Sequence, residues 1–393
     1  MKNITILGST GSIGVNTLNV IDNLDQDYNI VGLSANTSAN TILSQIKKYK
    51  PEVVAIADLN TAGFVKEQLK GYDITILPGR SGLLELSSRN DVDLLFNALV
   101  GSSGMEPTLC AIKSSVDVAL SNKESLVMAG DIIESEKIKS GAKIFPVDSE
   151  HSAIWQCLVG EKIDEVEKII LTGSGGPFRT RDINTLIDVK IQDALNHPNW
   201  EMGKKITIDS ASMMNKGLEV IETKWLFGIE SNRIEIVIHP ESIIHSMVEF
   251  KDKSVKAQLG IPDMKVPIQY ALTYPDRKSS MWESLDLSKI GSLSFEPPNL
   301  DRFPCISLAY EALKKGGTYP AVLNVANEQA VYRFLNSEIT FTDIPIIIEQ
   351  ACDKHDYILH PTLEELLFLE NWTVDFVKSF KTKVSLTRGP CVY

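Results

Sequence analysis

Two acidic residues that stand close together are the most chemically suggestive feature of the chain. Asp148 and Glu150 lie in the segment PVDSEH (146–151), directly after the apolar run 142–145. If the extended backbone continues through them, their side chains share one face and begin about 7 Å apart, with Ser149 pointing the other way. Two buried carboxylates this close repel each other, so the pattern predicts a shared proton, a bound cation or a solvated acidic loop.

A third carboxylate, some seventy residues later, favours the cation. In DSASMMNKGLE (209–219), Lys216 precedes Glu219 by three residues and Asn215 precedes it by four, so these side chains crowd one face of a predicted helix. Glu219 and the earlier acid pair would form an all-oxygen site suited to Mg²⁺ or Mn²⁺. The histidines lack zinc-ligand spacing, and we interpret His151 as a structural residue or one that supports the ligands from behind.

A possible phosphate site follows a strand-like run. In LTGSGGPF (171–178), Ser174 and the backbone amides of a Gly-rich turn could hold a phosphate group. Ser210, Asn215 and Lys216 could complete that site. Taken alone, the turn could equally be a plain loop.

Two further segments could approach a small ligand. HPNWEMG (197–203) places an indole and a thioether between Pro and Gly, which is typical of a mobile apolar lid, although Trp200 could also be a core anchor. Lys123, in SNKES (121–125), follows another predicted strand, where open parallel sheets bind their ligands. A solvated lysine is the alternative interpretation.

The N-terminus carries a nucleotide-binding pattern. In GSTGSIG (8–14), the glycines at 8, 11 and 14 follow a short apolar strand and open a helix, so backbone N–H groups could hold a pyrophosphate. At the next strand end, residues 33–40 contain no acid to accept from a ribose 2′-hydroxyl. Neutral donors stand there instead, so the pattern favours NADP(H) over NAD(H).

The elements that must position these residues alternate between strand-like and helical patterns over residues 1–147. This alternation predicts a Rossmann-like, doubly wound parallel sheet. A central α/β (α+β) catalytic domain is expected over 148–275, with a long helix near 214–227 and a hairpin turning at 252–253. A Pro-rich linker over 276–304 and a small helical domain over 305–393 complete the prediction. The expected strands of the first domain are 4–7, 30–33, 53–57, 74–77, 94–98, 117–120 and 142–147.

Composition narrows the class of protein. The chain has 393 residues, 43% of them hydrophobic and 23% charged, as in ordinary globular proteins. A net charge of −12 argues against binding to nucleic acid or an anionic membrane. Five scattered cysteines, no apolar run of about 18 residues and a strand starting near Met1 favour a cytoplasmic protein without a signal peptide.

The motifs as a set are similar to those of a known family. GSTGSIG, NKES, PVDSEH, LTGSGGPF, HPNWEMG and SASMMNKGLE, in this order, closely resemble those of the 1-deoxy-D-xylulose 5-phosphate reductoisomerases, and so do IHPESIIHSMVEF (238–250) and LNVANEQAV (323–331). The resemblance implies an NADPH- and divalent-metal-dependent homodimer of the non-mevalonate isoprenoid pathway. Such an enzyme rearranges 1-deoxy-D-xylulose 5-phosphate and reduces the resulting aldehyde to 2-C-methyl-D-erythritol 4-phosphate.

The resemblance also implies residue roles. The metal would be held by Asp148, Glu150 and Glu219. The phosphate would be held by Ser174, Ser210, Asn215 and Lys216, the sugar end would meet Lys123, Ser149, Glu150 and His197, and Trp200 and Met202 would form the lid. NADPH would contact Gly8, Thr10, Gly11, Ser12, Ile13, Asn122, Glu124 and Gly203, with Asn36, Thr37 and Ser38 near the adenosine. The last three depart from the Gly, then Lys or Ser, then Asn that many family members carry.

Two rival functions can be distinguished from this one. A semialdehyde dehydrogenase would need a nucleophilic cysteine, and Cys110 and Cys157 lack a matching context. A catalytically idle NADP-binding sensor would not need the acids at 148, 150 and 219.

The alternation of Val255, Ala257 and Leu259 is compatible with a sheet-mediated dimer contact, but an intramolecular core would produce it equally well.

Overall fold

The computed structural model describes residues 2–24, 28–198, 200 and 202–381. Its internal contacts divide the chain into two compact units. The first unit comprises Met1–Leu126, Gly130–Trp155 and Asp263–Ser284, and the second comprises Val127–Ala129, Gln156–Pro262 and Leu285–Tyr393. Among the described residues, no helix is both long enough and apolar enough to cross a membrane.

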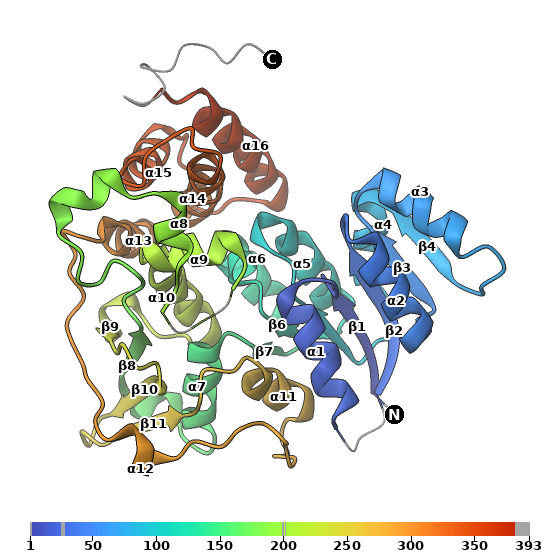
Figure 1. Ribbon diagram of the computed structural model, residues 1–393, viewed down its shortest axis with the longest axis horizontal. Coiled ribbons are helices and arrows are strands. Elements are labelled where there is room, and N and C mark those ends of the chain that lie inside the picture. The colour runs from blue at the N-terminus through green and yellow to red at the C-terminus, as the bar shows by residue number, and fades with distance from the viewer. Residues whose placement is uncertain (1, 25–27, 199, 201, 382–393) are drawn as a thin grey trace. The chain divides into compact units, whose positions relative to one another are not determined.

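The first unit is built on a parallel sheet of seven strands, in the order β4-β3-β2-β1-β5-β6-β7 (Figure 1). Each strand coincides with an apolar run in the sequence, because the inner strands of a parallel sheet are covered by helices on both faces, whereas the edge strand β4 is partly exposed. The predicted doubly wound sheet is therefore confirmed. The strands are β1 (Lys2–Leu7), β2 (Tyr28–Ala35), β3 (Val53–Ile56), β4 (Thr75–Pro78), β5 (Leu94–Asn97), β6 (Asp117–Leu120) and β7 (Ile144–Pro146).

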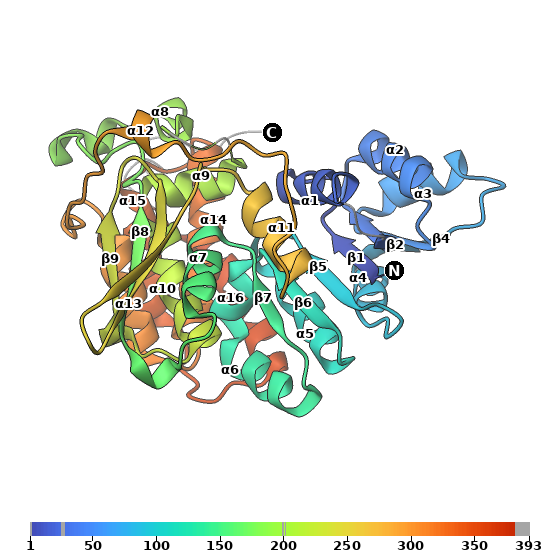
Figure 2. The ribbon, with the colours of Figure 1, turned by 90° about the horizontal axis from the view of Figure 1, so that it is seen from below.

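Helices lie on both sides of this sheet, with α1, α2 and α3 on one side and α4 and α5 on the other (Figure 2). The strand order reverses between β1 and β5, and ligands of such sheets bind beyond the carboxyl ends of the strands at that reversal. The helices are α1 (Ser12–Asp22), α2 (Ala39–Tyr49), α3 (Leu59–Gln68), α4 (Gly79–Ser87), α5 (Met105–Lys113) and α6 (Lys123–Ser140).

Helix α11 (Lys265–Thr273) belongs to the first unit, although the sequence places it at the end of the predicted catalytic domain. Its apolar residues Ile268, Ala271 and Leu272 are buried in the same core as Ile4. Burying this apolar face against an existing core is favourable, so the chain returns to a unit that it left more than a hundred residues earlier. Local sequence pattern carries no information on that return.

The second unit contains a mixed sheet of four strands, in the order β11-β10-β8-β9. Strand β9 is parallel to β8, whereas β10 is antiparallel to both β8 and β11. The predicted hairpin is confirmed, and Lys253 in its turn has a positive φ of 70°. The strands are β8 (Val166–Gly173), β9 (Ile234–Ile238), β10 (Ile244–Phe250) and β11 (Val255–Leu259).

Helices make up most of the remaining second unit. The last four helices confirm the predicted helical C-terminal region, and α10 matches the helix expected near 214–227. Helix α16 begins with a reciprocal capping box between Thr362 and Glu365. The helices are α8 (Ile191–Leu195), α9 (Lys204–Ala211), α10 (Met214–Phe227), α12 (Leu287–Ile290), α13 (Pro304–Lys315), α14 (Tyr319–Leu335), α15 (Asp343–Lys354) and α16 (Leu363–Ser379).

The expectation that the backbone stays extended through the acid pair is wrong. Strand β7 ends at Pro146, and helix α7 (Ser149–Leu158) begins three residues later. The carbonyl oxygen of Asp148 accepts the N–H of Ser152 at 2.8 Å, which places Asp148 at the start of the helix. Aspartate is a favoured residue at that position, and Glu150 in the first turn favours the helix dipole. The charges therefore mark a helix start.

Candidate active site

The glycine turn of the first unit connects β1 to α1 and lies against the end of β5. Gly8 has a φ of +71°, and a Cβ added there would lie 2.6 Å from the carbonyl oxygen of Ala98. A Cβ on Gly14 would lie 2.3 Å from the carbonyl oxygen of Gly8. Both contacts are too short for any side chain, so the backbone path of the turn requires glycine at these two positions.

Two polar residues that the sequence analysis did not single out hold this turn in place. The Ser34 hydroxyl accepts the N–H of Gly8 at 2.9 Å. Gln45 of α2 donates to the carbonyl oxygen of Ser9 at 2.8 Å and accepts from the Ser9 hydroxyl at 2.7 Å. The sequence does contain a signal for Gln45, which stands between Ile42 and Ile46 on an otherwise apolar helix face. Because buried polar side chains are normally hydrogen-bonded, a glutamine at such a position is expected to have a specific partner.

The start of α1 fits a pyrophosphate group. Gly11 and Ser12 are exposed at this helix terminus, and Gly11 has no side chain with which to cap it. Helix N-terminal amides carry a partial positive charge and bind anions. On the neighbouring strand β2, Asn36, Thr37 and Ser38 are exposed just beyond its carboxyl end. Thr10 and Ile13 are partly buried beside the turn.

The side chain of Asn122, which is predicted to contact NADPH, forms hydrogen bonds with other residues of the protein. Its amide nitrogen donates to the carbonyl oxygens of Leu99 and Gly101 at 3.0 and 2.9 Å, and to Glu124 at 3.1 Å. Its side-chain oxygen accepts the N–H of Ser125 and caps α6. Asn122 therefore ties the loop after β5 to the start of α6, and its contact with NADPH stays a prediction.

Lys123 and Asp148 meet because they follow neighbouring strands. Strands β6 and β7 pair in parallel, with Leu120 opposite Pro146. The Lys123 Nζ lies 2.5 Å from Asp148 Oδ2, and the two side chains are only 7% and 14% exposed. The His151 Nδ1 lies 3.8 Å from the same carboxylate oxygen. A lysine is thus one cation beside this acid pair, which the sequence analysis had not considered.

Glu150 is the second predicted metal ligand in the first unit. One of its carboxylate oxygens lies within 4.8 Å of one from Asp148. The Ser149 hydroxyl donates to Glu150 at 2.6 Å, so it does not point to the opposite side as an extended backbone would require. Carboxylate oxygens are the ligands that a hard divalent cation prefers, so this pair could bind one.

In the second unit, the Gly-rich turn after β8 packs against the segment that joins α9 to α10. A Cβ on Gly173 would lie 2.9 Å from Cε of Lys216, so the lysine side chain crosses this glycine. Gly176 has a φ of +66°, and a Cβ there would lie 2.6 Å from the carbonyl oxygen of Ser210. The structure therefore brings together the two segments that the sequence proposed as one phosphate site.

Helix α10 presents its polar residues as the spacing predicted. The Lys216 Nζ lies 2.6 Å from Glu219 Oε2, and the Asn215 amide donates to Glu219 Oε1 at 2.5 Å. Glu219 is fully buried. Removing a carboxylate from water costs several kcal/mol unless it is paired and hydrogen-bonded, so Lys216 and Asn215 offset that cost here.

His197 is a neutral imidazole with a defined tautomer. The backbone N–H of Trp200 donates to its Nδ1 at 3.0 Å, so the proton lies on Nε2, which is 3.2 Å from the Ser174 hydroxyl oxygen. Burial, and then the positive charge of Lys216, lower the pKa of His197 to about 4. Ser174 Oγ also accepts the N–H of Gly176 at 3.2 Å, so its own hydrogen can be donated to an anion.

The predicted lid is only partly described. Trp200 and Met202 are partly buried, whereas Asn199 and Glu201 lie outside the described residues. The indole ring of Trp200 lies 6.4 Å from the imidazole ring of His245. Gly203 is exposed and directly precedes α9. These positions do not distinguish a lid from a core anchor, so the lid stays a prediction.

Comparison with known proteins assigns the chain to a family. Residues 4–130 match the model of 1-deoxy-D-xylulose 5-phosphate reductoisomerase, residues 144–227 its C-terminal domain, and residues 259–376 the DXP reductoisomerase C-terminal domain. The 1-deoxy-D-xylulose 5-phosphate reductoisomerase of Chloroherpeton thalassium is 52% identical over 96% of this chain and 97% of its own length. The chain belongs to the 1-deoxy-D-xylulose 5-phosphate reductoisomerase family. The enzyme of Acetivibrio thermocellus is 50% identical over 96% of this chain and 99% of its own length.

Solved reductoisomerase structures resemble the chain throughout. A DOX-P reductoisomerase in complex with NADPH, fosmidomycin and magnesium has a TM-score of 0.92 at 38% identity, covering 98% of this chain and 99% of that one. The reductoisomerase of Zymomonas mobilis in complex with NADPH has a TM-score of 0.89 at 41% identity, covering 96% and 98%. The family resemblance read from the sequence motifs is therefore confirmed.

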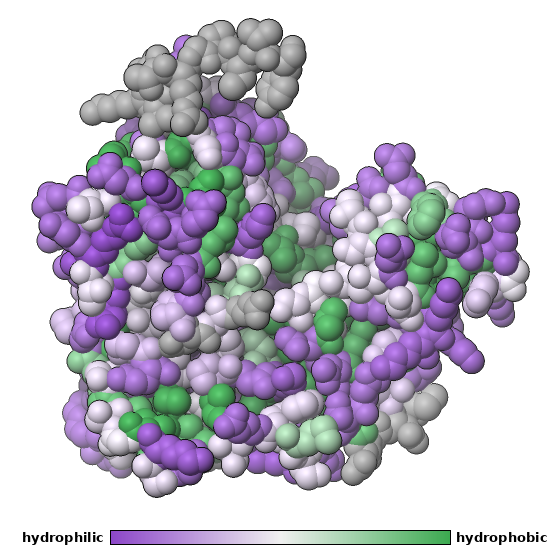
Figure 3. Space-filling model, viewed as in Figure 1, coloured by the Kyte–Doolittle hydropathy of each residue, from purple (hydrophilic) through white to green (hydrophobic). Residues whose placement is uncertain are grey.

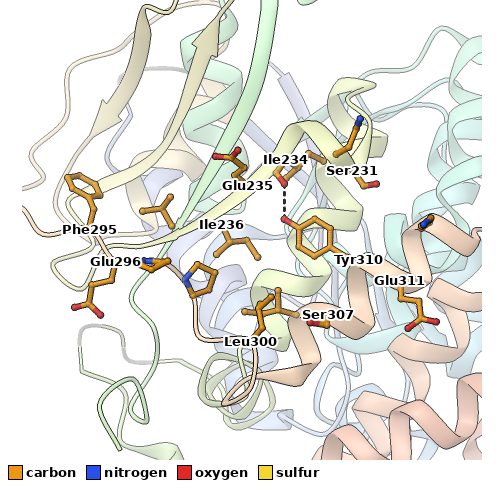
Figure 4. A pocket seen from close by; sticks show the side chains of 16 residues that line it. Ser231, Ile234, Glu235, Ile236, Phe295, Glu296, Leu300, Ser307, Tyr310 and Glu311 are labelled. Atoms are coloured by element: carbon orange, nitrogen blue, oxygen red, sulfur yellow. Dashed lines mark hydrogen bonds between the residues drawn. The ribbon is translucent and has the colours of Figure 1, made fainter.

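One large cavity in the second unit contains no predicted site residue. It has a volume of about 1000 Å³ and lies in the second unit beside β9 and α13 (Figure 4). The Tyr310 hydroxyl in its wall donates to the carbonyl oxygen of Ile234 at 2.8 Å. Burial raises the pKa of Tyr310 to about 12, so this group stays a neutral donor. Cavity size alone would have pointed away from the residues that can do chemistry.

Proposed function

We propose that this chain converts 1-deoxy-D-xylulose 5-phosphate to 2-C-methyl-D-erythritol 4-phosphate, with NADPH and a divalent cation, in the non-mevalonate route to isoprenoid precursors. The observation that carries the proposal is the cluster around Ser174, His197 and Lys216. It combines a hydroxyl donor, a neutral imidazole and a buried ammonium group at a glycine turn. Such a donor set suits the phosphate of a sugar phosphate.

Each end of the substrate has its own residues. Ser174, Ser210, Asn215 and Lys216 would bind the phosphate. Lys123, Ser149, Glu150 and His197 would orient the sugar end, and Trp200 and Met202 would exclude water. Lys123 has the charge to act on substrate oxygens, because it is an ammonium group held beside Asp148. His197 stays neutral above its pKa of about 4, so it would donate a hydrogen bond through Nε2 without adding charge.

Two groups that the family uses fit the residues present. Asp148, Glu150 and Glu219 would supply the oxygen ligands that Mg²⁺ and Mn²⁺ prefer. The glycine turn, whose two essential positions leave no room for a Cβ, fits the pyrophosphate of NADPH. When bound, the cation supplies Lewis-acid polarisation of substrate oxygens, and NADPH supplies the hydride that reduces the aldehyde formed by skeletal rearrangement.

A second copy of the chain is the partner that we propose. Strand β11 ends the four-stranded sheet, and its residues Val255 and Leu259 are 49% and 37% exposed. Figure 3 shows hydrophobic surface where Figure 1 draws this part of the sheet. Exposed apolar edge strands pair readily with another strand, which supports a sheet-mediated homodimer. Light scattering of the purified chain tests it, and a monomer at micromolar concentration would exclude it.

A cytoplasmic location is part of the proposal. The four described cysteines, Cys110, Cys157, Cys305 and Cys352, are all unpaired. Unpaired thiols are typical of a reducing compartment. Burial raises the pKa of Cys157 to about 11, which makes it a poor nucleophile and weighs against a semialdehyde dehydrogenase.

The test is a spectrophotometric assay of NADPH oxidation with 1-deoxy-D-xylulose 5-phosphate, with and without Mg²⁺ or Mn²⁺. We expect oxidation only when both the substrate and a divalent cation are present. NADPH binding without oxidation under any metal would favour the idle sensor instead. Oxidation that persists with a chelator and is lost in Cys157→Ser would favour the cysteine-dependent alternative.

A further inference from the structure

A buried carboxylate lies next to the predicted phosphate residues without belonging to them. Asp209, in the last turn of α9, is 2% exposed and directly precedes Ser210. The Lys205 Nζ, one turn earlier in the same helix, lies 2.8 Å from Asp209 Oδ2. A buried charge is tolerated when each of its oxygens is satisfied, so the second carboxylate oxygen also needs a donor.

That donor comes from a distant helix. The Asn327 amide nitrogen, on α14, donates to Asp209 Oδ1 at 2.8 Å across 118 residues of sequence. Asn327 is fully buried, and among the described residues nothing bonds to its side-chain oxygen. The hydrogen bond from its amide nitrogen to Asp209 is therefore the polar contact that the Asn327 side chain makes among the described residues. Hydrogen bonds to a charged group are stronger than those between neutral groups, so this bond can fix the carboxylate in one position.

Asp209 anchors a sharp reversal of the chain. The Ser212 hydroxyl donates to the carbonyl oxygen of Asp209 at 3.2 Å. The backbone N–H of Met213 donates to the carbonyl oxygen of Ser210 at 3.1 Å. Met213 has a φ of +60°, which is uncommon for a residue with a side chain. Helix α10 begins at the next residue and carries Asn215 and Lys216 in its first turn.

We propose that Asn327 is a positioning residue for the phosphate end of the site. By holding Asp209, it fixes Ser210 at the end of α9 and, through the reversal, the first turn of α10. These are the groups that must face the glycine turn at 173–176 to bind a phosphate together. The inference rests on the proposed function, and it assigns Asn327 no contact with the substrate.

The same helix offers a matched control. Asn324 stands one turn before Asn327 on α14 and is also fully buried. Among the described residues, neither of its amide atoms has a hydrogen-bond partner. Truncating either asparagine to alanine removes the same atoms from a buried position, so both variants should lose stability. Only Asn327→Ala also releases Asp209.

The experiment compares Asn327→Ala with Asn324→Ala in the full chain. With NADPH and Mg²⁺, we expect Asn327→Ala to raise KM for 1-deoxy-D-xylulose 5-phosphate about tenfold, equivalent to about 1.4 kcal/mol, with kcat within about threefold. Calorimetric titration with inorganic phosphate should show a similar loss of affinity. Asn324→Ala should keep KM within about twofold even where its melting temperature falls.

Several outcomes decide the matter. An unchanged KM and phosphate affinity in Asn327→Ala, or an equal rise in Asn324→Ala, would overturn the positioning role. The nearly isosteric Asn327→Leu, which removes the donor without adding a charge or leaving a large cavity, is measured beside them in case the alanine variant does not fold. It should raise KM and weaken phosphate binding as Asn327→Ala does, and unchanged values would also overturn the positioning role. If the wild-type chain does not turn over the substrate, the proposed function fails, and the phosphate titration still tests Asn327.

Discussion

The two glycine-rich turns of the chain each follow a strand, yet they are suited to hold anions in different ways. In the turn at 8–14, the added Cβ atoms of Gly8 and Gly14 would meet backbone oxygens, so these glycines serve the path of the main chain. In the turn at 173–176, Gly176 also faces a backbone oxygen, but an added Cβ on Gly173 would meet the side chain of Lys216. The first turn offers helix amides to an anion, and the second makes room for an ammonium group.

The difference has an electrostatic consequence. The segment GSTGSIG contains no charged residue, so its affinity for an anion would come from the geometry of the backbone. At the second turn, Lys216 of α10 pairs with the buried Glu219, and burial together with the charge of Lys216 lowers the pKa of His197. Substitutions in the second region should therefore spread from one group to the next, whereas those in the first should act on the turn itself.

The largest expected effect comes from Glu219→Gln. The change keeps the shape of the side chain but removes the charge proposed to bind the metal and paired with Lys216. We expect metal-dependent turnover to fall by at least about a thousandfold, on the order of 4 kcal/mol, while NADPH affinity changes by less than about twofold. Steady-state kinetics and nucleotide fluorescence measure the two quantities. Activity near the wild-type level would refute the metal assignment of Glu219.

The first turn should respond to the addition of a single carbon. In Gly14→Ala, the new Cβ would have to displace the carbonyl oxygen of Gly8, 2.3 Å away, so we expect NADPH affinity to fall about a hundredfold. Gly63→Ala, on α3, is the matched control because no atom lies within 4 Å of its added Cβ. That variant should gain up to about 1 kcal/mol of stability and bind NADPH normally. Unchanged NADPH affinity in Gly14→Ala would contradict the backbone role of the turn.

The second turn can be tested through the pKa of His197, which lies near 4 because of burial and the charge of Lys216. In Lys216→Met we expect this pKa to rise, since the positive charge is removed, but to stay below its usual value because the ring remains buried. NMR titration of the histidine rings measures the shift. A pKa that does not move would show that Lys216 does not act on His197.

The same pKa predicts how stability depends on pH. The pKa of His197 is lower in the folded chain than its ordinary value of about 6.5, so the unfolded chain takes up the proton first. The neutral ring therefore supports folding fully above pH about 6.5, and this contribution declines as pH falls towards 4. Chemical denaturation at several pH values should show a smaller decline in His197→Gln.

Local sequence pattern accounts for much of the fold and for part of the site. Apolar runs bounded by turns located the seven parallel strands, because the strands of a helix-covered parallel sheet are rich in apolar residues. The spacing of Asn215, Lys216 and Glu219 placed them together, because three and four residues apart means one helix face. Both inferences concern residues within one element.

Interactions between distant elements were not predictable in the same way. Asn327 reaches Asp209 across 118 residues, and no periodicity within either helix indicates that contact. Lys123 meets Asp148 because β6 and β7 are neighbours in the sheet, an order fixed by the fold as a whole. The helix start at Ser149 could have been predicted from the sequence, because Asp148 followed by Glu150 is a recognisable pattern at helix N-termini.

The smallest expected effect concerns cofactor preference in the first unit. Thr37 is exposed beyond the end of β2, in a stretch of neutral residues where a ribose 2′-phosphate would lie. Thr37→Arg adds a cation in solvent, where an ion pair contributes about 0.2–1 kcal/mol, so NADPH should bind up to about fivefold more tightly. NADH lacks the phosphate, so its affinity serves as the internal control. An equal gain in affinity for both nucleotides would mean that the new side chain contacts a part that they share. Residues 36–38 would then not lie beside the 2′-phosphate of NADPH.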